Sequence, residues 1–422
     1  MTNALHDSNK RLIPAVLLLL AGALLVSVAP DRRWPELRKK IGARLFVPSP
    51  LPSLNTESRG EFSRAPGVVA ERIVYRTEFG LKVPAVIYRP AARGTKLPAM
   101  IVVNGHGGDK YSWYSFYTGI LYARAGAVVL TYDPIGEGER NMQRKSGTRA
   151  HDRYVPPPEM AQRMGGLMIT DVMQAVSYLR GRADVDPKRI AALGYSMGSF
   201  VLSIACALDT RIHACVLVGG GDLDGKDGYW DTNSKKMCQS IPYQTLSFLG
   251  DRPAALYTLE AQRGPALVFN GSADEVVEIP THGSDFFRDL RARAIESAGS
   301  NRNVFDYAFE PGGGHRPYWL TKPVALWLNK HLRFPDWSGA SIERMPETHV
   351  SEWAKANGVP MDKGYSDEHR EGGTMALGTG VPNVPRSALN VFSEAGWAEE
   401  KADLILETWL ERAKLAVEKG KP

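Results

Sequence analysis

Short apolar runs alternate with amphipathic stretches between residues 68 and 334, and this alternation limits the possible fold more than any other feature. The runs are rich in β-branched and aromatic residues and are bounded by glycine or proline, as strands are. They read RIVYRTEF, KVPAVIYRP, AMIVVN, AVVLTYD, RIAALGY, ACVLVGG, PALVFNG and NVFDYAFE. The stretch GLMITDVMQAVSYLRG has apolar residues at the three- and four-residue spacing of a helix. This pattern predicts an α/β fold with a mostly parallel, twisted sheet and helices on both faces.

Three segments depart from the alternation. Residues 221–263 include DGYWDTNSKKMCQSIPYQTL, and we predict that they form a lid insertion over one end of the sheet. Residues 335–422 are predicted to be a C-terminal extension packed on the catalytic domain, because EEKADLILETWLERAKLAV has one apolar stripe. Residues 31–67 are rich in Pro, Ser and Arg and predict a linker with a short surface helix at ELRKKIGARLF.

The N-terminal residues 1–30 are typical of a targeting segment. The uncharged apolar run at 12–29 has a length between that of a signal-peptide core and that of a membrane span. Ser27 and Ala29 form a small-x-small cleavage pattern, but Pro30 would follow the cut and hinder it. A cleaved signal peptide and an uncleaved membrane anchor therefore both stay open. We expect a periplasmic or secreted protein, or one tethered to the membrane through residues 12–29.

Composition narrows the range of partners. The chain has 52 basic and 46 acidic residues among 422, a formal charge of +6, and no block of like charges, which argues against nucleic acid as a partner. Its three cysteines, Cys206, Cys215 and Cys238, are too few for a disulfide framework and lack zinc spacing. We interpret them as small buried thiols. No metal or organic cofactor is predicted, and the sequence does not predict an oligomeric state.

The stretch LGYSMGS places Ser196 between the strand run RIAALGY and the apolar, helix-like SFVLSIACALD. A serine held at a sharp strand-to-helix turn needs small residues two before and two after it, and Gly194 and Gly198 occupy these positions. The start of the following helix also favours negative charge at the serine. Ser196 is therefore the candidate nucleophile.

A serine hydroxyl needs a base, and the base needs an acid to orient it. His315 in FEPGGGHRPYW follows the last strand run, and Asp274 in VFNGSADEVV follows the strand run before it. Asp222 and Asp224, which follow ACVLVGGG, and the adjacent Glu275 remain alternative acids. The other histidines lack the strand-end context and are interpreted as structural: His6, His151, His213, His282, His331, His349 and His369.

An oxyanion formed at this serine needs two N–H donors. One is the amide of Met197, directly after the nucleophile. The other is expected from Gly107 or Gly108 in IVVNGHGGDK, a loop that follows a strand and is free of obstructing side chains. His106 in the same loop is interpreted as a residue that holds the loop.

Together, the motifs NGHGGDK, YDPIGEGER, DVDPKRIAALGYSMGS, NGSADEVV and GGGHRPYW resemble the α/β-hydrolase superfamily, in particular its acetyl xylan esterase-like, dienelactone hydrolase-like and prolyl oligopeptidase-like branch. The resemblance covers about residues 70–333. It implies the roles given above for Ser196, Asp274, His315, Met197 and the glycine pair. It also implies that Asp133 shapes a loop near the site, although Asp133 could equally be a turn-forming residue. Ser199 departs from the pattern, since many relatives have a second glycine there.

The predicted function is that of a serine hydrolase which cleaves carboxylic esters through an acyl-enzyme, with small acyl groups such as acetyl on carbohydrate or related small molecules. The alternative is a serine peptidase or amidase of the prolyl oligopeptidase-like type. No propeller-like repeat precedes the catalytic part, which favours the esterase. His106, Tyr195, Tyr229 and Trp230 are the predicted substrate-pocket residues, with Tyr243 as a further candidate wall of the pocket.

Overall fold

The computed structural model describes residues 33–92, 96–154, 158–232, 239–299, 303–360 and 374–419. The apolar run predicted as a signal peptide or anchor, residues 12–29, lies outside this range. Within the described part of the chain, no helix combines the length and apolar character needed to cross a membrane.

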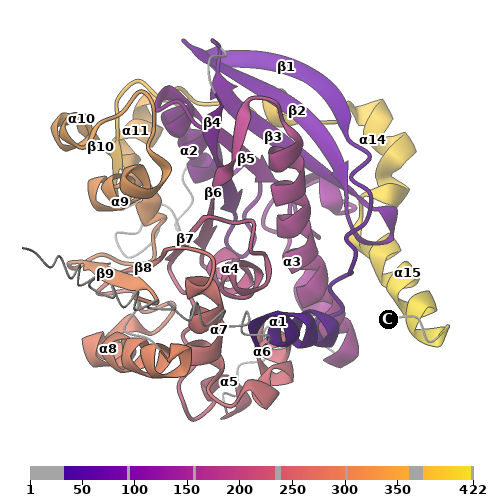
Figure 1. Ribbon diagram of the computed structural model, residues 1–422. Helices are drawn as coiled ribbons and strands as arrows, with labels where there is room; N and C mark the ends of the chain where they lie inside the picture. Colours follow the sequence, from indigo (N-terminus) through magenta and orange to yellow (C-terminus); the bar gives the residue numbers. More distant parts are fainter. Residues whose placement is uncertain are drawn as a thin grey trace, which may run out of the picture.

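A nine-stranded sheet forms the centre of the molecule, in the order β1-β2-β3-β5-β4-β6-β7-β8-β9 (Figure 1). Its strands are β1 Glu57–Ala65, β2 Val68–Arg76, β3 Lys82–Pro90, β4 Leu97–Val103, β5 Val128–Tyr132, β6 Val185–Tyr195, β7 Ala214–Val218, β8 Ala266–Gly271 and β9 Asp306–Glu310. From β5 through β9 all neighbouring strands are parallel, whereas β1, β2, β3 and β5 pair antiparallel. This confirms the predicted mostly parallel sheet.

Strand β1 corrects the prediction for residues 31–67. These residues do contain a short helix, α1 Arg33–Arg44, but β1 pairs with β2 and is the edge strand of the sheet. That part of the chain therefore belongs to the sheet and not to a linker. The sequence ESRGEFSRA did not predict a strand, because an exposed edge strand does not need the alternating apolar residues that mark a buried one.

Helices cover both faces of the sheet, as predicted. The face with α3 Pro158–Gly181, α4 Met197–Leu208, α7 Arg252–Ala261 and α8 Ile279–Ala298 forms one core cluster, and α2 Trp113–Arg124 and α9 Lys322–Leu332 cover the other face. The pleat of β4 illustrates the division, because Ile101 enters the first cluster and Val102 the second. Both sides of the parallel strands are thus buried, which explains their continuous apolar sequences.

The segment predicted as a lid lies between β7 and β8. It contains the short helices α5 Tyr229–Thr232 and α6 Ser240–Thr245, followed by α7. Helix α7 packs against α4 and α8 in the helical layer. The part of the segment that can face the site is therefore the stretch before α7.

After β9 and α9 the chain wraps around the sheet. Its elements are α10 Gly339–Arg344, β10 Glu347–His349, α11 Val350–Ala356, β11 Met375–Leu377, α13 Arg386–Leu389, α14 Glu394–Glu400 and α15 Leu406–Glu418. Trp353 and Leu389 join the core cluster around α2, and the apolar stripe of α15 buries Trp409 against a cluster that includes Met164 of α3. The extension, drawn in orange and yellow in Figure 1, thus packs on both sides of the molecule.

Two of the cysteines pair, contrary to the interpretation that all three are free thiols. Cys206 near the end of α4 and Cys215 in β7 form a disulfide. The sequence separation of nine suggested no motif, but the turn between α4 and β7 returns the chain so that the two side chains meet. Cys238 lies outside the described residues.

Candidate active site

Ser196 lies at the tip of the turn between β6 and α4. Its backbone has φ 54° and ψ −118°, a conformation that costs free energy for any residue other than glycine. The strand before it ends at Tyr195 and the helix after it begins at Met197, so the serine stands at the carboxyl edge of the sheet. The Ser196 N–H donates to the carbonyl of Val218, 2.9 Å away, which ties the turn to the end of β7.

The two glycines flanking this turn are required by close backbone approach. A Cβ at Gly194 would lie 2.6 Å from the carbonyl oxygen of Gly198. A Cβ at Gly198 would lie 2.1 Å from the carbonyl oxygen of Val103 in β4. Both distances are shorter than real contacts, so neither position accepts a side chain without a shift of the backbone.

Ser199, the residue that departs from the family pattern, has a definite place in the turn. Its hydroxyl donates to the Ser196 carbonyl at 2.6 Å and accepts from the Gly221 N–H at 2.8 Å. The side chain therefore links the nucleophile turn to the glycine-rich segment after β7.

His315 and Asp274 meet at the same edge of the sheet, in the loops that follow β9 and β8. The Nδ1 atom of His315 lies 2.8 Å from Oδ2 of Asp274, and both side chains are buried. The other carboxylate oxygen accepts the N–H groups of Val276 and Val277, at 3.0 and 3.3 Å. These bonds fix the carboxylate, so that it can hold the imidazole in one orientation.

The three alternative acids do not reach His315. Asp224 forms an ion pair with Arg252 at 2.5 Å and accepts the Trp230 N–H. Asp222 is fully buried, and this burial raises the pKa of its carboxyl well above the usual range. Glu275 is exposed. Asp274 is the acid that the fold brings to the histidine.

The turn after β7 lies against both His315 and Ser196. A Cβ at Gly219 would lie 2.9 Å from Cε1 of His315, and one at Gly220 would lie 3.4 Å from the Ser196 carbonyl oxygen. Tyr195, immediately before the serine, donates its hydroxyl to the His315 carbonyl at 3.0 Å. Ser196, His315 and Asp274 therefore belong to one cluster at the sheet edge.

The loop after β4 approaches the serine through Gly105. A Cβ at Gly105 would lie 3.2 Å from the Ser196 Cβ, so this glycine packs directly on Ser196. The predicted donor Gly108 is less suitable than expected, because its N–H already donates to the Gly105 carbonyl at 2.8 Å. The carbonyl of Gly107 accepts the Gly147 N–H at 2.9 Å. Of the two predicted donors, Gly107 is thus the one whose N–H does not donate within this turn.

Beneath the loop lies a buried ionic network that includes Asp133. The Lys110 ammonium contacts Asp133 and lies 2.9 Å from Glu139, and all three side chains are fully buried. Asp133 also accepts the backbone N–H groups of Lys110 at 3.3 Å and Glu139 at 2.8 Å. Asp133 therefore does more than form a turn, because it anchors the end of the 105–110 loop.

His106 anchors the other end of this loop. Its Nε2 atom lies 2.9 Å from a carboxylate oxygen of Asp152, and its ring is 5.0 Å from the ring of His151. His151 is fully buried, and burial lowers its pKa to about 4, so its imidazole is neutral near pH 7.

A small pocket of about 80 Å³ opens beside Ser196. Tyr229 and Trp230 line it as predicted, whereas Tyr195 and His106 do not, because Tyr195 packs on His315 and His106 turns to Asp152. Tyr243 is also absent from this lining and lies buried behind Trp230. Sequence analysis missed the remaining lining residues, which are Phe200, Leu223, Gln239, Val276, Val277, Glu278 and His282. The available signal was that all of them follow β6, β7 or β8, whose carboxyl ends lie at the same edge of the sheet.

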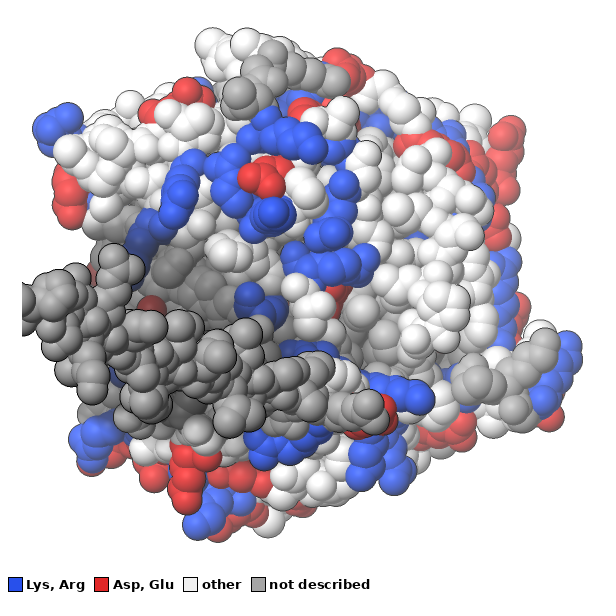
Figure 2. All heavy atoms as spheres, in the orientation of Figure 1, with Lys and Arg blue, Asp and Glu red and all other residues white. Residues whose placement is uncertain are grey.

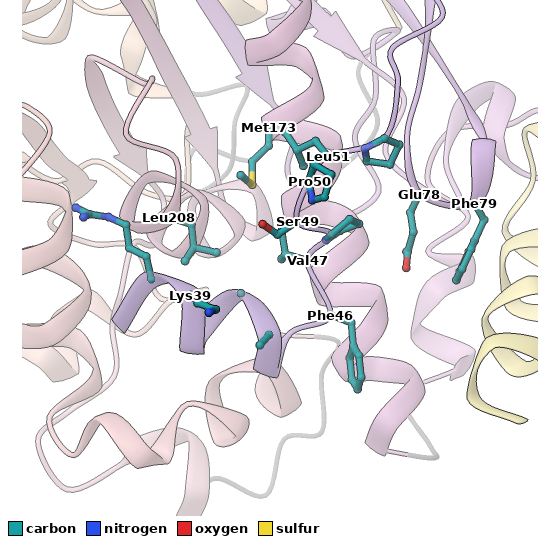
Figure 3. Close-up of a pocket in the computed structure, with 15 residues that line it drawn as sticks. Lys39, Phe46, Val47, Ser49, Pro50, Leu51, Glu78, Phe79, Met173 and Leu208 are labelled. Carbon is teal, nitrogen blue, oxygen red and sulfur yellow. The ribbon is translucent and has the colours of Figure 1, made fainter. Parts of the chain in front are cut away.

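A larger hollow of about 850 Å³ lies away from the triad, beside α1. Figure 3 shows its lining, with Leu208 and Met173 on one side and Glu78 and Phe79 on the other. Figure 2 shows many Lys and Arg side chains on the face that holds α1. The residues that line this hollow do not include Ser196, Asp274 or His315.

Two family models match overlapping parts of the chain. Residues 57–218 match the acetyl xylan esterase (AXE1) family, and residues 158–338 match the prolyl oligopeptidase family. Each match falls in the sheet and the site, and together they reach from β1 to the end of α9.

Relatives and solved structures agree with these matches. The chain is 30% identical over 146 residues to a protein named as hydrolase YtaP from Bacillus subtilis (strain 168), covering 32% of this chain and 47% of that protein. It is 27% identical over 157 residues to thiohydrolase apmlB from Arthrinium phaeospermum, covering 36% and 43%. The matched region thus spans less than half the length of these curated relatives.

Among solved structures, methylesterase BT1017 aligns with a TM-score of 0.57 and 23% identity, covering 92% of this chain and 73% of that one. A glucuronoyl esterase from Solibacter usitatus aligns with a TM-score of 0.50 and 15% identity, covering 73% and 94%. At these identities the likeness establishes the fold, which is that of the α/β hydrolases.

Proposed function

We propose that this chain, an α/β hydrolase of the acetyl xylan esterase-like and prolyl oligopeptidase-like branch, is a serine hydrolase of carboxylic esters. The observation that supports this most strongly is the buried 2.8 Å contact between His315 and Asp274 at the sheet edge where Ser196 occupies its strained turn. A nucleophile, a base and an orienting acid are the groups that acyl transfer to a hydroxyl requires.

In the proposed reaction, His315 takes the proton of Ser196 as the serine oxygen attacks the ester carbonyl. The tetrahedral intermediate expels the alcohol, which receives that proton from His315. Water then attacks the acyl-enzyme, again with His315 as base, and releases the acid and the free serine. Asp274 holds Nδ1 of the imidazole, which leaves the opposite nitrogen, Nε2, to exchange the proton with the serine.

The oxyanion is proposed to bind two backbone amides. Met197 supplies the first from the start of α4, where the helix dipole also favours negative charge. The second comes from the loop that Gly105 presses against Ser196, from the amide of Gly107 or of the adjoining His106. Gly108 is not a donor in this proposal, because its N–H already donates to the Gly105 carbonyl.

The pocket beside Ser196 supports a small acyl group. Its volume of about 80 Å³ and its walls of Phe200, Leu223 and Trp230 suit an acetyl group and leave no room for a long chain. Tyr229 and Trp230 belong to the segment before α7, which we propose acts as the lid. The match to the acetyl xylan esterase family and the esterases among the solved structures support a carbohydrate ester as the substrate.

Hydrolysis of p-nitrophenyl acetate, butyrate and octanoate tests this proposal. We expect kcat/KM to fall along the series, because a narrow pocket excludes added methylenes, each of which is typically worth about 1–3 kcal/mol in selectivity. Ser196→Ala should abolish turnover of all three esters, with a loss in kcat on the order of 10⁶. Activity that is equal or rising toward octanoate would contradict the small acyl pocket, and activity retained by Ser196→Ala would contradict the serine mechanism.

Peptide or amide hydrolysis is the second candidate, because residues 158–338 match the prolyl oligopeptidase family. The same triad would serve both reactions. Release of amine from acetylated p-nitroanilides and short proline-containing peptides distinguishes them. We expect amide turnover far below ester turnover, and the reverse order would favour the peptidase.

A further inference from the structure

Three side chains next to the proposed oxyanion loop form a cluster that the ester-cleaving chemistry does not use. They are His106, His151 and Asp152, and one ligand atom from each lies within 4.8 Å of the other two. His106 comes from the loop after β4, whereas His151 and Asp152 come from the short helical segment Ala150–Tyr154. Two separate parts of the chain thus bring two imidazoles and a carboxylate together.

The contacts within the cluster leave one imidazole nitrogen unsatisfied. Nε2 of His106 lies 2.9 Å from a carboxylate oxygen of Asp152, so these two side chains are partners of each other. His151 is fully buried, and its Nε2 has no hydrogen-bond partner among the described residues, with the nearest carboxylate oxygen of Asp152 at 3.6 Å. A buried polar atom without a partner costs free energy, typically about 1–3 kcal/mol, unless something else occupies the gap.

A bound cation would satisfy all three groups. Two neutral imidazole nitrogens and a carboxylate oxygen are the donors that zinc and similar divalent transition metals prefer. The cluster is also open on one side, because 38% of the Asp152 side chain and 13% of the His106 side chain are exposed to solvent. Three protein ligands with an open side resemble zinc sites that keep one position for water or another oxygen donor.

We propose that His106, His151 and Asp152 bind one divalent transition-metal ion of the zinc type. The ion would connect the Ala150–Tyr154 segment to the loop that Gly105 packs against Ser196. Its effect would be to fix this loop. No bond change or proton transfer at Ser196 uses the ion, so metal binding can be tested apart from the proposed ester hydrolysis.

The test uses the full chain without a histidine tag, freed of metal with a chelator. Titration with Co²⁺ is followed by its visible absorption, and equilibration with Zn²⁺ followed by desalting gives the bound metal by mass spectrometry. We expect one ion per chain. Asp152→Asn should weaken binding by at least about tenfold, since even the loss of a group that merely supports a metal ligand typically costs 10–100-fold. His151→Gln should do the same.

Two variants serve as matched controls, Asp186→Asn and His349→Gln, whose side chains lie on other parts of the molecule. They should bind metal as the parent chain does. Circular dichroism in the absence of metal checks that Asp152→Asn, whose side chain is partly exposed, remains folded. Failure of the parent chain to bind Co²⁺ or Zn²⁺, or undiminished binding by folded Asp152→Asn, would overturn the proposal. Because the readout is metal binding without substrate, neither result depends on whether the protein cleaves esters.

Discussion

At the scale of single residues, Asp274 and Glu275 offer a sharp comparison because they are adjacent acids with opposite surroundings. Asp274 is buried and contacts His315, whereas Glu275 is exposed. We expect Asp274→Ala to lower kcat by about 10⁴, as loss of a triad acid does. Glu275→Gln should stay within a few-fold of the parent enzyme. Steady-state kinetics with p-nitrophenyl acetate measure both, and a large loss in Glu275→Gln alone would mean that the acid is misassigned.

Glu78 gives a prediction for stability that is independent of catalysis. Burial raises its pKa to about 7, and its carboxyl accepts the indole N–H of Trp409 in α15 at 2.9 Å. The folded state therefore keeps the Glu78 carboxyl protonated over a pH range in which the unfolded state has lost this proton. The free energy of unfolding therefore falls as the pH rises from about 5 to 8. The free energy of unfolding falls by roughly 3 kcal/mol over this pH range, since one pKa unit corresponds to about 1.4 kcal/mol.

Glu78→Gln removes the titrating carboxyl, while the amide oxygen of the glutamine can still accept the indole N–H of Trp409. We expect the variant to unfold at a higher denaturant concentration than the parent chain at pH 8 and at a similar concentration at pH 5. Urea unfolding at both pH values measures this difference. Other buried acids titrate in both proteins, so only the difference in unfolding midpoint between variant and parent tests Glu78. A difference that is the same at both pH values would refute the raised pKa of Glu78.

The three proposed catalytic residues could be selected from the sequence, whereas the contacts around them could not. Ser196, Asp274 and His315 could be found because each follows a recognisable strand run. The bond from the Gly108 N–H to Gly105, and the place of His282 in the pocket, depend on loop geometry that residue spacing does not encode.

At the scale of elements, the loop after β4 depends on charges buried below it. Lys110 lies between Asp133 and Glu139 without solvent contact. Lys110→Met would leave the buried Asp133 carboxylate without its cation, whereas Glu139 keeps Arg144 as a partner at 2.6 Å. Breaking a buried pair in this way typically costs about 3–5 kcal/mol. We expect that loss in urea unfolding, together with a lower kcat because the oxyanion loop loses its anchor. Lys96→Met, at an exposed lysine, is the control.

Combining Lys110→Met with Asp133→Asn should recover part of the lost stability, because one buried charge is removed with its partner. Unchanged stability in Lys110→Met would show that the network does not hold the loop.

The parallel strands could be predicted, whereas the edge of the sheet could not. Strands buried on both faces, such as β4 and β7, must be apolar throughout, which makes them visible in the sequence. Strand β1 is held by backbone pairing with β2 and needs no such pattern. Helix α7 was predicted as part of a lid but packs in the helical layer on the sheet. The sequence did not separate these two positions, because a helix that covers a sheet and a helix in an insertion have similar sequences.

At the scale of the whole molecule, the C-terminal extension connects to the same network. Glu139 accepts the N–H groups of Val391 and Phe392, at 2.9 and 3.0 Å, while it pairs with Lys110. The chain then continues to α15, which buries Trp409 beside Glu78. Neither family match extends beyond residue 338, so this connection reaches outside the part of the chain that they cover. The extension is thus part of the scaffold that supports the site.

The disulfide between Cys206 and Cys215 bears on where this molecule matures. Disulfides persist in oxidising compartments, and the apolar run at residues 12–29 is typical of an exported chain. We propose export, and we expect protein isolated from the periplasm or the medium to react with one equivalent of a thiol reagent in guanidinium chloride, and with three equivalents after reduction. The single thiol is that of Cys238, because the chain has three cysteines and two are paired. Cys238→Ser should therefore give no reaction before reduction. Three reactive thiols without reductant would mean that Cys206 and Cys215 stay reduced, and the pair would then no longer support export.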